Sequence, residues 1–130
     1  MLYRSIAFVL QLWICSSCFA QRDDFRSEVY GSGCGYAGTD PAPRVQVEEL
    51  IQRNDTATIY TWLNSKETGL QAYGAEAVVR LKRKGMVISS TKLLKVEALL
   101  ISKAQVQVCR GCIHMFMELR EALKEFNDQQ

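Results

Sequence analysis

Apolar residues recur at helical spacing along most of this chain. The clearest pattern runs between Ser65 and Gly85, where one face of the predicted helix carries Leu70, Tyr73, Ala77, Val78 and Leu81. The same spacing predicts four further helices, near residues 41–53, 55–64, 90–103 and 113–126. We therefore expect the apolar face of the central helix to form the middle of the core.

Residues suited to helix ends occur where these segments meet. Side chains that can cap a helix start stand at Asp40, within Asn54-Asp55-Thr56, and at Ser89 or Ser90. Gly85 suits a left-handed helix end. Pro41 suits the first turn of a helix. These positions favour several short helices joined by tight turns.

Two stretches break the helical pattern. Between Gln105 and Val108, polar and apolar residues alternate, which predicts a short extended passage. Residues 21–43 hold four glycines around Cys34 and both prolines of the chain, a composition unsuited to a helix. This segment also has apolar anchors, so we expect part of it to be tied onto the domain through Val29, Tyr30 and Tyr36.

Together these patterns predict an all-α fold. We expect residues 44–127 to form a small bundle or a short solenoid of stacked helical hairpins, preceded by the irregular segment 21–43. No β-sheet core is expected.

The first twenty residues have the composition of a secretory signal peptide. Arg4 supplies a positive start, residues 6–14 an apolar run, and Cys18-Phe19-Ala20 a small-x-small end. The run is shorter than the roughly 20 residues of a membrane-spanning helix. We therefore expect cleavage near Ala20, no transmembrane helix in the mature chain, and a secreted or periplasmic protein. Because small residues precede Cys18, an envelope lipoprotein with its lipid anchor at Cys18 is the alternative.

Charge and motif content argue against several classes of function. The whole chain has a formal net charge of +2, and without the leader 15 basic residues face 14 acidic ones, which selects no class of partner. The basic cluster of Arg80 and residues 82–84 lies at a helix end, where the dipole favours cations, and it lacks interleaved aromatics. We expect a solvated helix end there and no nucleic acid partner. The chain has no phosphate-binding loop, no nucleophile elbow and only one histidine, so we expect no enzyme.

Three cysteines remain after cleavage, an odd number for an oxidising compartment. One interpretation is a structural disulfide, either Cys109 to Cys112 or Cys34 to one of them. We predict the long link, because a loop of about 75 residues contributes roughly 4 to 5 kcal/mol in the chain-entropy model. The alternatives are thiol redox chemistry at Cys109-Arg-Gly-Cys112 and a zinc site whose four ligands are Cys34, Cys109, Cys112 and His114.

Three motifs carry a resemblance to known proteins. The segment Gln71–Leu81, after Leu63-Asn64-Ser65, is similar to the second-helix signature of HEAT-like repeats, in which small residues let neighbouring helices approach. Together with Cys34–Pro41 and the Cys-x-Gly-Cys of Cys109–Cys112, it resembles a group of uncharacterised exported bacterial proteins with a HEAT-like helical repeat domain. The resemblance implies a helical fold and an exported location, and it implies no particular activity.

A helical domain without a catalytic set is suited to binding. Stacked helices present groove surfaces for protein or peptide ligands. Trp62 is a candidate contact residue, because it and Tyr60 point in different directions on their helix. We therefore expect an exported interaction module with an unidentified protein or peptide partner and no cofactor. The alternative is a thiol redox or zinc-binding protein centred on the cysteines.

Overall fold

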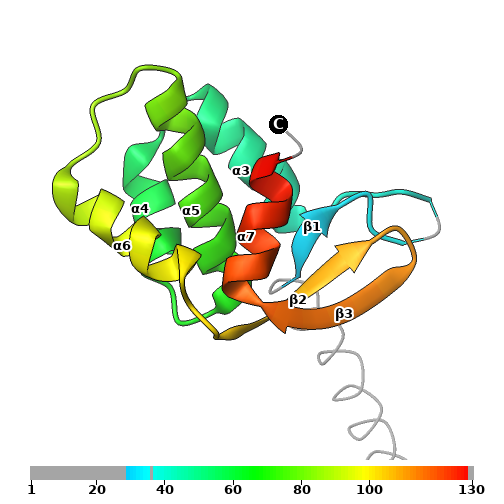
Figure 1. Ribbon diagram of the computed structural model, residues 1–130. Coiled ribbons are helices and arrows are strands. Elements are labelled where there is room, and N and C mark those ends of the chain that lie inside the picture. Colours follow the sequence, from blue (N-terminus) through cyan, green and yellow to red (C-terminus); the bar gives the residue numbers. More distant parts are fainter. Residues whose placement is uncertain (1–28, 36, 129–130) are drawn as a thin grey trace, which may run out of the picture.

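The computed structural model describes residues 29–35 and 37–128, which form five helices and one three-stranded sheet (Figure 1). In chain order the elements are β1 (Tyr30–Ser32), α3 (Ala42–Gln52), α4 (Thr56–Leu63), α5 (Thr68–Arg83), α6 (Ser90–Leu100), β2 (Gln105–Arg110), β3 (Ile113–Glu118) and α7 (Leu119–Asp128). The described part of the chain is therefore an α/β fold, with most of its helices gathered to one side of the sheet.

The sheet brings together segments that lie far apart in the sequence. β2 is its central strand, parallel to β1 and antiparallel to β3. Tyr30 of β1 lies opposite Val108 of β2, and Val108 lies opposite Met115 of β3. Gly111 and Cys112 form the two-residue turn between β2 and β3. The φ angle of Gly111 is +56°, a conformation that glycine adopts without strain.

The prediction of an all-α fold is wrong, and the helix expected from Ile113 begins only at Leu119. Phe116 lies three residues before Leu119 and seven before Leu123, so the apolar stripe of α7 extends into β3 by coincidence of spacing. The polar-apolar alternation that begins at Gln105 belongs to β2, and the turn after β2 returns the chain antiparallel to it. A β-hairpin therefore replaces the first part of the predicted last helix.

The helix α5 forms the centre of the helical part, as its apolar pattern predicted. All of its expected core residues are fully buried except Leu70, which is half-buried. The backbones of α4 and α5 approach closely at Gly74, where a Cβ atom would lie 2.5 Å from the backbone nitrogen of Leu63. The small residues of α5 therefore admit α4, and a larger residue at position 74 would force the two helices apart.

Two of the expected helix ends are confirmed, whereas Asp40 does not cap α3 and its carboxylate accepts a hydrogen bond from the Gly33 nitrogen instead. Asp55 caps α4, because its carboxylate accepts a hydrogen bond of 3.1 Å from the backbone nitrogen of Thr58. Gly85 follows α5 with a φ angle of +88°, the left-handed conformation expected at a helix end. Short-range capping chemistry thus sets these boundaries as the sequence indicated.

Much of the N-terminal region lies outside the described residues. This applies to the expected signal peptide 1–20, with its cleavage site at Ala20 and the alternative anchor at Cys18, and to Tyr36. Val29 and Tyr30 are buried, which confirms that the irregular segment is tied onto the domain. Over the described ranges, none of the helices has the length and apolar character needed to cross a membrane.

Candidate functional site

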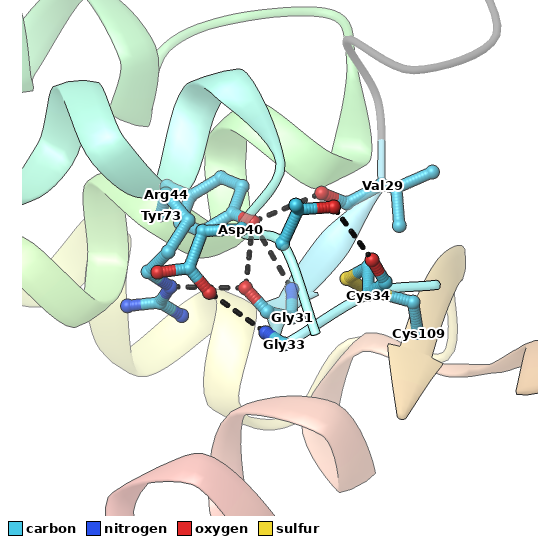
Figure 2. Close-up of a disulfide and its surroundings, with 9 residues drawn as sticks. Val29, Gly31, Gly33, Cys34, Asp40, Arg44, Tyr73 and Cys109 are labelled. Atoms are coloured by element: carbon cyan, nitrogen blue, oxygen red, sulfur yellow. Dashed lines mark hydrogen bonds between the residues drawn. A yellow bond between two sulfur atoms is a disulfide. The ribbon is translucent and has the colours of Figure 1, made fainter. Parts of the chain in front are cut away.

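A disulfide bond joins the glycine-rich segment to the central strand of the sheet (Figure 2). It links Cys34 to Cys109, whose Cα atoms lie 5.5 Å apart and which are separated by 75 residues in the sequence. The backbone nitrogen of Gly35 also donates a hydrogen bond of 2.6 Å to the carbonyl oxygen of Gly111. The predicted disulfide is therefore present, and it fastens the segment beside the hairpin turn.

The strand β1 has no room for a side chain at Gly31. A Cβ atom there would lie 2.5 Å from the carbonyl oxygen of Cys109 and 2.7 Å from its sulfur atom. The Tyr73 hydroxyl donates to the carbonyl oxygens of Val29 and Gly31, at 3.0 and 3.1 Å, and accepts from the Gly31 nitrogen at 3.1 Å (Figure 2). Tyr73 of α5 therefore takes the place that a neighbouring strand would occupy.

A buried ion pair lies beside these contacts. Arg44 of α3 and Glu76 of α5 are 6% and 1% exposed, and they form a two-pronged pair with nitrogen-to-oxygen distances of 2.7 and 2.9 Å. The Arg44 Nε donates to the Gly31 carbonyl oxygen at 3.0 Å, and the Tyr30 hydroxyl donates to Glu76 at 2.7 Å. We call Tyr30, Arg44, Tyr73 and Glu76 the β1 clamp. It ties one edge of the sheet to two helices.

Aromatic rings enclose the Arg44 guanidinium. Its central carbon lies 4.8 Å from the ring centre of Tyr73, 5.6 Å from that of Tyr30 and 5.8 Å from that of Phe126. A guanidinium within about 6 Å of an aromatic face is attracted by the ring quadrupole. The cation is therefore stabilised by the rings as well as by Glu76.

The protonation states of the clamp are fixed around neutral pH. Burial opposes ionisation of Glu76, but the hydrogen bonds and charge of Arg44 outweigh it, so the pKa of Glu76 lies below its ordinary value. Burial raises the pKa of Tyr73 to about 12, and burial with the nearby Glu76 raises the pKa of Tyr30 well above 10. Around neutral pH, Glu76 therefore stays ionised and the two tyrosines stay neutral, so the clamp is suited to a structural role.

The strand β3 has the opposite character, because it exposes apolar side chains. It carries three large hydrophobic residues that face solvent, and the most exposed is Phe116 at 68%; the others are Ile113 and Met115. Within the described part of the chain, β3 pairs only with β2, so its outer side has no strand beside it. We call residues 113–118 with this outer side the β3 edge.

The residues proposed for redox or zinc chemistry lie near one another, but two of the sulfurs are bonded. His114 lies opposite Cys109 in the hairpin register, and Cys112 is an exposed free thiol in the turn. The sulfurs of Cys34 and Cys109 are joined, which removes two of the four ligands that the zinc interpretation requires. Among the described residues, no three His, Cys, Asp or Glu side chains are grouped to hold a metal ion.

Trp62 and Arg80 are both half-buried. Trp62 is half-buried and its ring lies edge-on to Tyr73, with 6.3 Å between ring centres, so part of it belongs to the core. Arg80 is not at a solvated helix end. Its guanidinium bonds to Glu48 at 2.6 and 2.7 Å and approaches Glu76 at 3.2 Å, which extends the clamp toward the surface.

Glu76 is the residue that sequence reasoning missed. It follows Tyr73 by three positions and precedes Arg80 by four, so it lies on the apolar face of α5. A carboxylate on a buried helix face is costly unless a cation pairs with it. The position of Glu76 on this apolar face was therefore the sequence signal for a buried ion pair.

Compared with known proteins, the chain matches no family model, no curated protein and no solved structure.

Proposed function

We propose that this protein is an exported interaction module that binds a protein partner along the β3 edge and performs no catalysis. The observation that carries the proposal is the exposure of Phe116, Ile113 and Met115 on one strand at the edge of the sheet. Exposed apolar edge strands readily pair with another chain, and natural proteins usually blunt them. An edge left open in this way is suited to β-strand addition.

The hairpin register indicates which backbone groups of β3 face outward. Residues that flank a two-residue turn exchange both of their backbone hydrogen bonds, and Arg110 and Ile113 occupy those positions. Such pairs alternate along the ladder, so every second residue of β3 aims its N–H and C=O away from β2. The outward residues are His114, Phe116 and Glu118.

The rest of the molecule supports a rigid scaffold for this edge. The Cys34–Cys109 disulfide and the β1 clamp hold β1 and β2 against the helices. Arg110, at the end of β2, also forms an ion pair with Glu125 of α7. A preorganised edge lowers the ordering cost that a binding partner must overcome.

Two substitutions at one position test the backbone pairing. Peptides selected from a displayed random library on the Cys112→Ser protein serve as probes. Phe116→Ala keeps the outward N–H and should weaken these peptides only in part, whereas Phe116→Pro removes it and should abolish binding. Val87→Pro, at a loop position 96% exposed, is the matched control. Equal binding to the wild type and to Phe116→Pro would contradict the proposal.

A second candidate function is thiol–disulfide exchange, favoured by the exposed free Cys112 three residues after the bonded Cys109. The Cys112 thiolate would attack one sulfur of the existing bond. A new S–S bond forms as the Cys34–Cys109 bond breaks, and the released thiolate takes up a proton from solvent. Peptide mapping without reductant, after incubation at mildly alkaline pH, decides it. Recovery of only Cys34–Cys109 would rule this exchange out.

The same purified protein tests zinc binding and export. Stoichiometric zinc, with three titratable thiols after chelation, would replace the disulfide account by the zinc alternative.

For export, the proposal expects a mature N-terminus at Gln21. A lipid-modified N-terminus at Cys18 that partitions into detergent would instead establish the lipoprotein.

A further inference from the structure

We propose that the partner on the β3 edge is a second copy of this chain, which pairs antiparallel across a twofold axis at Phe116. The inference rests on the proposed use of this edge and names its occupant. Pairing would join two three-stranded sheets into one continuous sheet. The order of the outward residues along β3 supports this pairing.

The outward residues of β3 form a self-complementary series. In a twofold antiparallel pair centred on Phe116, each Phe116 lies opposite Phe116 of the second copy. The same symmetry places His114 opposite Glu118 of the second copy, and it does so twice. An aromatic pair at the centre is then flanked at both ends by a hydrogen-bond donor facing a carboxylate. Aromatic and opposite-charge pairs are among the favourable cross-strand neighbours.

Other registers of the same parity lose these pairs. Centring on His114 puts the two histidines opposite each other, and centring on Glu118 brings two carboxylates face to face, which is unfavourable. Registers centred on Met115 or on Met117 pair Phe116 with His114 or with Glu118 of the second copy. In each of them, one outward residue of each β3 lies opposite no residue of the other β3. Only the register centred on Phe116 uses all three outward residues of both copies.

The surroundings of this register fit a second copy. On the inner face of the sheet, Met115 lies opposite Met117 of the second copy, so an exposed apolar residue meets a half-buried one. Glu118 already forms an ion pair with Arg120 of its own chain, with 2.5 Å between the carboxylate Oε2 and the Arg120 Nε, so its carboxylate is held at the end of the strand. The contact is thus apolar in its middle and polar at its ends, as specific interfaces are.

The register also separates the two free thiols. Cys112 precedes β3, so antiparallel pairing places the two Cys112 side chains at opposite ends of the contact. A disulfide between Cys112 residues is therefore not part of the association. The Cys112→Ser protein should associate as the wild type does, with or without reductant.

Sedimentation analysis of the Cys112→Ser protein over a range of concentrations tests the charge register. We expect a monomer–dimer equilibrium in which His114→Glu, which sets Glu opposite Glu118, raises the dissociation constant by about tenfold. Adding Glu118→Lys to His114→Glu should restore association, because a carboxylate at position 114 then faces an ammonium group at position 118. Val87→Glu and Glu97→Lys make the same charge changes at exposed loop and helix positions and should have no effect.

Cross-linking tests the position of the axis. In the Cys112→Ser background, Phe116→Cys should form a disulfide-linked dimer on mild oxidation, because paired strand residues lie within disulfide reach. Val87→Cys is the control and should remain monomeric. A dimer whose dissociation constant is unchanged by the substitutions at positions 114 and 118, and that fails to cross-link through position 116, would overturn the proposed pairing.

The outcomes separate the dimer from the broader proposal. A protein that stays monomeric at every concentration, yet still binds selected peptides in a Phe116→Pro-sensitive way, overturns the second copy as partner and keeps the binding edge. A monomer whose β3 binds no peptide overturns both. Circular dichroism of each variant confirms that lost association does not reflect lost folding.

Discussion

The two edge strands of the sheet differ in what contacts the backbone N–H and C=O groups on their outer sides. β1 is three residues long, and the backbone N–H and C=O of Gly31 that no strand pairs with form hydrogen bonds to Tyr73 of α5 and Arg44 of α3. β3 is six residues long and, within the described chain, meets only β2 on one side. Buried side chains that close an edge stabilise the fold, whereas an open apolar edge can pair with another chain.

This difference predicts where substitutions act. Changes at the β1 edge should lower the free energy of unfolding, because they touch buried charges and a long covalent link. Changes at the β3 edge should leave stability nearly intact and alter association instead. Variants at each edge test that division.

Loss of the disulfide should have the largest effect on stability. Cys34→Ser, made in the Cys112→Ser background to prevent new pairing, opens a link between residues 75 positions apart. The chain-entropy model predicts a loss of roughly 4 to 5 kcal/mol. Urea unfolding of this variant against Cys112→Ser alone measures it. A loss below about 1 kcal/mol would show that the clamp holds β1 without the covalent bond.

Breaking the buried ion pair should come next. Glu76→Gln leaves the Arg44 charge buried without its carboxylate, a change that costs about 3 kcal/mol or more. Glu48, whose carboxylate lies 3.5 Å from Arg44, offsets part of that cost. Glu48→Gln is the control, because its side chain is 39% exposed and exposed pairs contribute only about 0 to 1 kcal/mol. Equal losses for the two variants would contradict the importance of burial.

The Glu76 comparison has a definite pH dependence. The pKa of Glu76 is below its ordinary value of 4.5 in the folded protein, because Arg44 and Tyr30 outweigh the effect of burial. Its contribution is therefore complete above that ordinary value and is lost as the pH falls through the lower folded pKa. The stability gap between wild type and Glu76→Gln should be constant near neutral pH and shrink in acid. A gap that widens in acid would contradict the assignment.

A Cβ atom on β1 should have an intermediate effect. Gly31→Ala places a methyl group against the backbone and sulfur of Cys109, so the strand must shift. Overpacking of this kind typically costs about 1 to 3 kcal/mol. Ser32→Ala, the next position along β1 and exposed, is the matched control and should change little. Thermal unfolding of both variants compares them, and similar melting temperatures would refute a tight contact at Gly31.

The helices could be predicted from the sequence and the sheet could not, for physical reasons. Helical spacing is local, so Tyr73, Val78 and Leu81 identified the face of α5 correctly. β1 contains only three residues, and its partner Val108 lies 78 positions after Tyr30, so no local period reveals the pairing. At the hairpin, Gly111 and Cys112 directly precede the helix predicted near residues 113–126, so a turn between two strands was not expected there.

Of the candidate site, the sequence predicted only the disulfide bond. Counting cysteines indicated the link from Cys34 to the C-terminal pair, because that argument needs no fold. Arg44, Glu76 and the β3 edge depend on tertiary contacts between three separate elements. The helix predicted near residues 113–126 includes Phe116, because the spacing of Phe116 from Leu119 fits a helix as well as a strand that precedes one. Solvent exposure of Phe116 follows from the hairpin alone.

The smallest effect on stability is expected at the open edge. Phe116→Ser replaces a side chain that is 68% exposed, so it should change the free energy of unfolding by no more than about 0.5 kcal/mol. The same substitution removes the apolar centre of the β3 edge, and it should weaken self-association in sedimentation at equal protein concentration. Parallel urea unfolding and sedimentation of one preparation separate the two quantities. A large loss of stability would place Phe116 in the core of the monomer and remove the contrast between the two edges.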